Sequence, residues 1–284
     1  MDRGGIWRKV VRVAAALVFV VLVGATYQGV ATALERRQFP RPGGLVDVGG
    51  HQLHIYCVGS GSPTVVLEAP ALGMSAAWGA VQPEVARVTR VCSYDRAGLG
   101  WSESSGDPYD PARTPEELRT LLERANEQPP FVVAGHGLGA AFATLFASRY
   151  GDRTAALILI DAPLAGEAST DSSVLLQVPG VLPWLARTGA LRLTRTLSGS
   201  ADGVPEPFGG ALSAFLVRPD HLARAARELS RWNDVTARAA RAPLSPHTSL
   251  VRLEIAGRSR LAFLTTSNAA PAVGAILEAV AGAR

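Results

Sequence analysis

The chain has 284 residues, of which 48% are hydrophobic, enough to bury a sizeable core in one large domain with an appendage. The net charge of +4 comes almost wholly from arginine, because Lys9 is the only lysine. The arginines are scattered among alanines, so the composition excludes a disordered chain and argues against a nucleic-acid partner.

The first predicted element is an apolar helix at the N-terminus. Residues 13–34 carry no charged side chain and are long enough to cross a hydrocarbon layer of roughly 30 Å. The basic residues of segment 1–12 hold that end in the cytoplasm by the positive-inside rule, which places the globular part outside. Arg36, Arg37 and Arg41 on the far side weaken this asymmetry. We therefore predict a single-pass cell-membrane protein, with the lipid bilayer as the partner of this helix.

A cleavable signal peptide is the alternative interpretation of the same segment. Ala31-Thr32-Ala33 has the small-x-small form of a cleavage site. We favour an uncleaved anchor, because the apolar stretch is long for the core of a signal peptide. Both interpretations predict an exported domain.

Residues 35–44 are predicted to form a linker, and the folded domain begins at residue 45. Alternating or continuous apolar runs predict strands at 45–49, 52–58, 64–69, 88–94, 131–134, 156–161 and 249–255. Helices are predicted at 114–125, where Thr114 begins a capping box with proline at the first helical position, and at 140–150, 219–241 and 269–283. The strand pattern stops between about 162 and 242, which predicts a helical insertion. Strands alternating with helices indicate an α/β fold, a mainly parallel sheet covered on both faces.

Four segments occur in the order and spacing of the α/β-hydrolase superfamily, which the chain resembles over roughly residues 45–162. They are Leu67-Glu-Ala69, Tyr94-Asp-Arg-Ala-Gly-Leu-Gly-Trp-Ser102, Gly135-x-Gly137-x-Gly139 and Leu157-Ile-Leu-Ile-Asp161. In particular, the chain resembles membrane-anchored bacterial α/β-hydrolases in which a hydrophobic helix precedes the domain. The resemblance implies an α/β-hydrolase fold over 45–284 with a helical cap at about 162–242. It fixes no activity, because the superfamily includes many enzymes and non-catalytic members.

The catalytic residues that the resemblance implies are missing at two positions. An apolar strand that runs into G-x-S-x-G forms the nucleophile elbow of this fold, and Gly137 occupies the serine position without a hydroxyl. The base histidine falls in register with Arg260, whose guanidinium stays protonated and does not serve as a general base. No aspartate follows Asp234, so the acid has no candidate. His136, beside the vacated position, is assigned a packing role.

The oxyanion hole is predicted to survive in part. The resemblance implies that the backbone N–H groups of Ala71 and Leu138 form it. Pro70 replaces a glycine that the family prefers, and its fixed φ is expected to shift the Ala71 N–H.

Cys57 and Cys92 fall on strands that the family's sheet order places side by side. In an exported domain they are a disulfide candidate, provided that their Cα atoms lie near 5.5 Å apart. Two buried free thiols are the alternative. Two cysteines without a histidine cluster predict no metal site, and no cofactor motif is visible.

We interpret the sequence as a membrane-anchored pseudohydrolase that binds a small apolar or carbonyl-containing ligand, or a protein partner. The alternative is an active ester or amide hydrolase with a non-standard nucleophile. A third hypothesis is an inert remnant.

Overall fold

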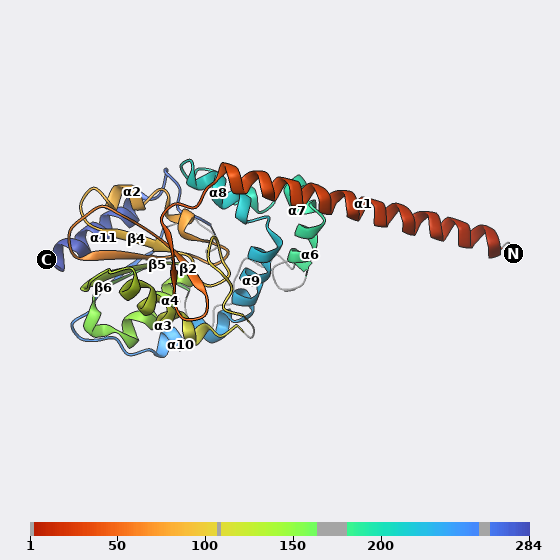
Figure 1. The fold of residues 1–284 in the computed structure, drawn as a ribbon. Coiled ribbons are helices and arrows are strands. Elements are labelled where there is room, and N and C mark those ends of the chain that lie inside the picture. The colour runs from red at the N-terminus through yellow and green to blue at the C-terminus, as the bar shows by residue number, and fades with distance from the viewer. Residues whose placement is uncertain (1–2, 107–108, 164–180, 256–261) are drawn as a thin grey trace.

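The structure, a computed structural model, describes residues 3–106, 109–163, 181–255 and 262–284. A long N-terminal helix projects from an α/β domain, and the two chain ends lie at opposite extremes of the molecule (Figure 1). The predicted fold class, an α/β-hydrolase fold preceded by one apolar helix, is confirmed.

The domain is built on a seven-stranded sheet of order β1-β2-β4-β3-β5-β6-β7. Its strands are β1 (Gly44–Asp47), β2 (Gln52–Val58), β3 (Thr64–Glu68), β4 (Val91–Tyr94), β5 (Phe131–His136), β6 (Thr154–Ile160) and β7 (Ser249–Leu253). β1 and β2 form an antiparallel hairpin, and β2 also pairs antiparallel with β4. Every pairing from β4 to β7 is parallel.

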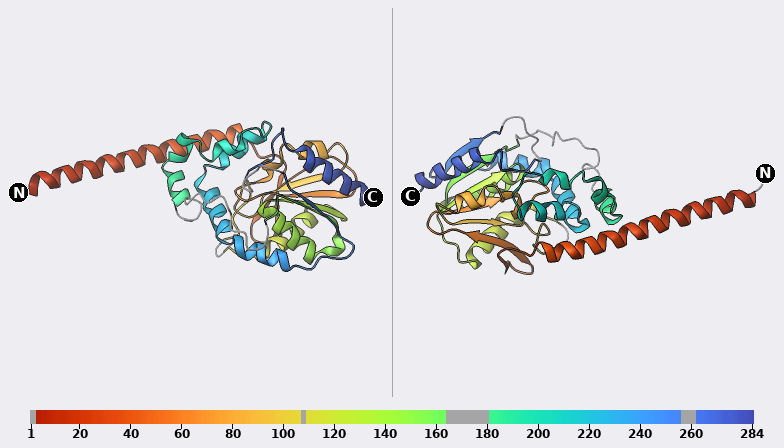
Figure 2. Two further views of the ribbon diagram at one scale, coloured as in Figure 1. Left: turned by 180° about the vertical axis from the view of Figure 1, so that it is seen from behind. Right: turned by 90° about the horizontal axis from the view of Figure 1, so that it is seen from above.

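Helices cover both faces of the sheet, as two further views show (Figure 2). They are α1 (Arg3–Gln38), η1 (Ser75–Trp78), α2 (Gln82–Val85), η2 (Pro111–Arg113), α3 (Thr114–Arg124), α4 (Leu138–Arg149), η3 (Gly151–Arg153), α6 (Val181–Arg187), α7 (Ala190–Thr194), η4 (Ser198–Ala201), α8 (Phe208–Phe215), α9 (Pro219–Ser230), α10 (Trp232–Arg241) and α11 (Ala270–Gly282). We call α6 to α10 the cap.

The continuous apolar runs of β3 and β5 supply both layers of the core. Val65 and Val132 pack with residues of α2 and α11 on one face. Val66 and Val133 pack with residues of α3 and α4 on the other. A strand buried on both faces needs this composition, which is why these strands were predictable.

Two local expectations for residues 88–125 were wrong. The strand predicted at 88–94 begins only at Val91, because Val88 and Thr89 still donate backbone hydrogen bonds to Val85 O. Thr114 does not cap its helix; instead Asp110 caps the preceding turn η2 by accepting from Ala112 N.

The single helix predicted at 219–241 is interrupted at Arg231, which separates α9 from α10. The interruption lets the two halves reach different clusters. Leu222 of α9 packs within the cap, whereas Trp232 of α10 packs against Phe142 of α4.

The apolar helix α1 extends beyond the predicted segment 13–34 at both ends, and residues 35–38, predicted as linker, are helical. Its stretch Ile6–Gln38 is long and apolar enough to cross a membrane. Its second half packs on the cap, where a Cβ at Gly24 would lie 2.1 Å from Thr188 O and Gln28 Nε2 donates to Val217 O. The helix is therefore continuous with the domain and not separated from it by a loose tether.

Candidate functional site

The sharp turn predicted between β5 and α4 is present. Gly137 joins the strand to the helix with φ 54° and ψ −124°, a backbone conformation that is accessible chiefly to glycine. Its N–H donates to Ile160 O of the neighbouring strand at 2.9 Å. The turn therefore keeps the form that would lift a side chain from the sheet, although Gly137 has none.

The two flanking glycines allow the helix to approach the strands closely. A Cβ at Gly135 would lie 2.5 Å from Gly139 O, and a Cβ at Gly139 would lie 2.4 Å from Glu68 O. Real Cβ atoms do not approach backbone atoms so closely, so Gly135 and Gly139 have a steric role that is independent of catalysis.

Apolar side chains pack around the residues assigned to the oxyanion hole. Ala71 and Leu138 are fully buried and form a cluster with Phe142, Trp232 and Val235. Leu138 is the first residue of α4, so its N–H belongs to the unbonded amides of a helix N-terminus. Of five cavities in the described part of the chain, none has Gly137, Leu138 or Ala71 in its wall.

His136, next to the vacated position, is buried and partnered. Its Nε2 atom lies 3.4 Å from Asp161 Oδ2, and its ring makes an edge contact with Trp78 at a centroid distance of 6.3 Å. Asp161 in turn accepts from Ile255 N, so these contacts tie the elbow to the segment that follows β7. The arrangement fits the packing role assigned to His136. Arg260, assigned to the vacated base position, lies outside the described residues.

A buried ion network, which the sequence analysis missed, connects the sheet to the cap. Arg96 lies 2.5 Å from Glu68 of β3 and 2.8 Å from Glu228 of α9. Its guanidinium also donates to the carbonyls of Ala69 and Pro70, in the loop assigned to the oxyanion hole. All three ionic side chains are at most 2% exposed. Glu228 lies 132 residues from Arg96 in the sequence, so their pairing leaves no local signal. Glu68 does give a signal, because a glutamate inside a buried strand indicates a cationic partner.

The two carboxylates of this network have opposite pKa shifts. Burial raises the pKa of Glu68 despite its contact with Arg96. Burial opposes the ionisation of Glu228 too, but Arg96 and Arg224 together outweigh it and lower the pKa of that carboxyl. The second cation explains the difference, since Arg224 Nη2 lies 3.1 Å from Glu228 Oε1.

A second buried group contains a serine, a histidine and an aspartate. His54 Nδ1 lies 2.9 Å from Asp95 Oδ2 and 3.4 Å from Ser75 Oγ, while His54 Nε2 donates to Pro42 O at 2.5 Å. A catalytic triad uses one ring nitrogen for the acid and the other for the nucleophile. Here both contacts fall on Nδ1 and a carbonyl occupies Nε2, so the geometry is structural.

His221, interpreted from the sequence as a helix-surface residue, is instead 2% exposed. Its Nε2 atom donates to Leu72 O at 2.9 Å, and its Nδ1 atom accepts from Gly100 N at 3.1 Å. Burial lowers the pKa of His221. The neutral ring thus holds the loop after β3, where Leu72 has a left-handed φ of 61°.

The cysteines Cys57 and Cys92 are register partners on β2 and β4 and are joined by a disulfide, with their Cα atoms 4.0 Å apart. Together with Glu127 they form the one group of potential metal ligands found within the described ranges. The disulfide leaves no thiolate there for a metal.

An apolar cavity of about 470 Å³ lies where α1 gives way to the domain. Its walls include Phe39, Pro40 and Pro42 of the connecting segment, Tyr56 and Trp101 of the domain, and Phe208 of α8. The cavity lies away from the elbow.

The family profile for the α/β-hydrolase fold matches residues 63–260, and the chain belongs to this family. Among solved structures, the epoxide hydrolase CorEH superposes with a TM-score of 0.63 at 17% identity, covering 85% of this chain and 99% of that one. The enol-lactonase from Burkholderia xenovorans superposes with a TM-score of 0.60 at 17% identity, covering 84% and 98%. Identities this low establish the fold and no activity.

Curated relatives match shorter segments. An uncharacterized protein of Bacillus subtilis is 30% identical over 154 residues, which are 52% of this chain and 46% of the relative. An uncharacterized vacuolar membrane protein of Saccharomyces cerevisiae is 32% identical over 89 residues, 31% of this chain and 14% of the relative. The chain thus spans less than half of either relative.

Proposed function

We propose that this protein is a membrane-anchored member of the α/β-hydrolase fold family that has lost serine-hydrolase chemistry and acts by binding. The main support is the elbow itself, where Gly137 keeps the strained turn but presents no attacking atom. The surrounding polar groups are engaged with one another, since Arg96 holds Glu68, Glu228 and two loop carbonyls. The missing hydroxyl at Gly137, beside charged groups that are already paired with one another, favours a structural role for this region.

The proposed anchor is α1, inserted with its basic N-terminal segment 1–12 in the cytoplasm and the domain on the other side. The disulfide between Cys57 and Cys92 supports this orientation, because disulfides persist in oxidising compartments outside the cytoplasm. Alkylation of the full-length chain in intact cells and in lysates, with and without prior reduction, tests the orientation. A chain whose cysteines react without reduction contradicts it.

The proposed ligand is small and apolar and occupies the cavity of about 470 Å³ beside Phe39, Trp101 and Phe208. Ligand cavities are mostly apolar with a few polar anchors, and this one matches in size and composition. The space above Gly137 is a weaker candidate, since Trp232 and Phe142 pack beside Leu138.

A fluorophosphonate probe tests the loss of catalysis in the detergent-solubilised full-length protein. We expect no covalent labelling and no saturable ester hydrolysis, because no hydroxyl projects from the elbow. Ser75→Ala serves as a matched variant, since Ser75 Oγ lies 3.4 Å from the ring nitrogen Nδ1 of the buried residue His54. Labelling of the natural protein that one serine substitution abolishes would overturn the proposal.

The second candidate function, a hydrolase with a displaced nucleophile, draws its support from Ser75, His54 and Asp95. Ser75 is 4% exposed and His54 is fully buried, so a substrate would have to open the fold to reach them. If this candidate is correct, Ser75→Ala removes probe labelling. We expect that variant to behave like the natural protein.

A further inference from the structure

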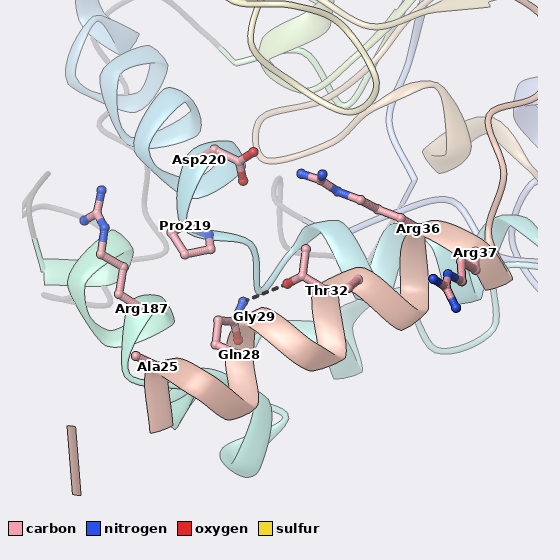
Figure 3. Close-up of a pocket in the computed structure, with 10 residues that line it drawn as sticks. Ala25, Gln28, Gly29, Thr32, Arg36, Arg37, Arg187, Pro219 and Asp220 are labelled. Carbon is pink, nitrogen blue, oxygen red and sulfur yellow. Dashed lines mark hydrogen bonds between the residues drawn. The ribbon is translucent and has the colours of Figure 1, made fainter. Parts of the chain in front are cut away.

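The C-terminal half of α1 and the cap form a groove that is rich in arginine. Its volume is about 810 Å³, and its walls include Arg36 and Arg37 of α1, Arg187 of α6, and Pro219 and Asp220 of α9. The side chain of Arg36 extends across the groove toward Asp220, and Arg187 rises from the opposite wall (Figure 3). Small residues of α1, Ala25 and Gly29, form the floor. The groove therefore presents three cations and one carboxylate.

The cations of this groove have no bonded acidic partner among the described residues, in contrast to two arginines that lie nearby in the cap. Arg192 is paired with Glu35, and Arg224 with Glu228. Arg36, Arg37 and Arg187 take part in no ion pair within the described ranges. Positive charge that gathers in a concave surface and exceeds the negative charge there attracts an anion.

A buried arginine adjoins the same groove. Arg218 is 5% exposed and lines a neighbouring cavity of about 250 Å³ that shares Arg36 and Asp220 with the groove. Its guanidinium lies 3.7 Å from the centre of the Phe215 ring, and its Nε atom has no hydrogen-bond partner among the described residues. A buried donor without an acceptor costs free energy that a bound anion would recover. The positive end of α9, which begins at Pro219, adds to the attraction.

The position of the groove along α1 identifies the anion. A helix rises 1.5 Å per residue, so crossing a hydrocarbon core takes roughly 20 residues. Counted from Val13, just beyond the last basic residue Arg12, this span ends near Thr32. Arg36 and Arg37 follow one turn later, at the depth of the lipid headgroups. The phosphates of the outer leaflet are the anions present at that depth.

The contacts between α1 and the cap extend deeper along α1 than the headgroup level. They begin at Gly24, about 12 Å before Thr32 at the rise of an α-helix. The helices that make them expose Trp184 (57%) and Leu193 (76%), side chains suited to a lipid interface. The polar groups on this face of α1 are satisfied within the protein, because Arg192 binds Gln28, Thr32 and Glu35.

We propose that the groove lined by Arg36 and Arg187, together with the adjoining Arg218, binds the phosphate headgroup of an anionic phospholipid from the outer leaflet, with α6 and α7 resting in that leaflet. This inference rests on the proposed anchorage of α1 and is independent of the loss of catalysis. The acyl chains would follow the small-residue floor formed by Ala25 and Gly29.

Thermal melting of the full-length protein in a non-ionic detergent tests the headgroup site. Dioleoylphosphatidylglycerol is expected to raise the melting temperature saturably, and dioleoylphosphatidylcholine and inorganic phosphate are expected to raise it little. The double variant Arg36→Gln and Arg187→Gln should weaken the phosphatidylglycerol effect by about tenfold or more, since it removes two charge-assisted contacts. The control variant Arg231→Gln and Arg241→Gln removes the same charge from exposed positions of the cap and should respond like the natural protein.

Equal stabilisation by the two lipids, or an unchanged response of the groove variant, would overturn the headgroup site. An equal effect of inorganic phosphate would overturn the lipid as its source. Native mass spectrometry of the natural protein gives a second measurement if the groove variant does not fold. It should detect retained anionic phospholipid, and a protein bearing only zwitterionic lipid contradicts the proposal. Carbonate extraction of membranes tests the anchorage separately, because a released chain refutes the anchor whatever the lipid result.

Discussion

Arg96 and Arg36 carry the same guanidinium group in opposite surroundings. Arg96 is 2% exposed and lies between two carboxylates and two backbone carbonyls, beside the elbow. Arg36 lies in the open wall of the groove beside α1, without a bonded carboxylate among the described residues. The first arrangement satisfies a buried charge within the fold, and the second leaves positive charge available to a ligand. This contrast separates a structural use of the region around Gly137 from the proposed binding use of the groove beside α1.

Removing Arg96 tests the structural half of this contrast and should have the largest effect. Arg96→Met leaves Glu68 and Glu228 buried without their main partner, so we expect the free energy of unfolding to fall by about 3–5 kcal/mol. Thermal melting of the solubilised protein measures the loss. The control Arg87→Met breaks an exposed pair with Glu84 and should cost about 0–1 kcal/mol. Similar melting temperatures for the two variants would remove the energetic basis of the contrast.

Restoring the missing hydroxyl tests whether the elbow is merely lacking one group. Gly137→Ser places a Cβ at a φ of 54°, which should cost about 1–3 kcal/mol of stability. We expect no ester turnover, because the resemblance to the family places Arg260 and no histidine at the base position, and Asp95 and Pro42 occupy both ring nitrogens of His54. Melting and ester assays on the same preparation measure both effects. Turnover by this variant would show that a working base remains and that the region around Gly137 retains catalytic groups.

The stability of the folded domain should depend on pH through His221. Because the pKa of this residue is lowered in the folded state, the unfolded chain binds its proton first as the pH falls. The contribution of His221 to the free energy of unfolding is complete above about pH 6.5, the pKa of histidine in the unfolded chain. Below that pH it is lost, by up to about 1.4 kcal/mol per pH unit. Melting between pH 7.5 and 5 should show this decline, with a shallower slope for His221→Gln. The exposed residue His247 gives the control His247→Gln, whose slope should match the natural protein.

Removing the groove arginines should have the smallest effect on stability. In the absence of phospholipid, the double variant Arg36→Gln and Arg187→Gln breaks no ion pair among the described residues. We expect its free energy of unfolding to stay within about 0.5 kcal/mol of the natural value. Melting in detergent freed of phospholipid checks this. A loss as large as that of Arg96→Met would mean that both arginine groups are structural.

The parts predictable from sequence are those with a local pattern. The apolar runs of β3, β5 and β6 gave three adjacent strands, and the glycines around residue 137 gave the elbow. The pairing of Arg96 with Glu228, the burial of His221 and the docking of α1 on the cap depend on contacts between distant segments. The break at Arg231 also has no local signal, because no glycine or proline lies between Asp220 and Arg241.

The contact between His54 and Pro42 has a consequence for how the domain moves. His54 Nε2 holds the carbonyl of Pro42, in the short segment that follows α1, and α1 itself is packed on the cap. Helix, connection and sheet therefore turn as one body. With α1 inserted as proposed, the domain keeps one orientation relative to the bilayer, and the face that carries α6 and α7 stays turned toward the lipid. In that orientation the cavities beside Phe39 and Arg36 lie close to the membrane surface.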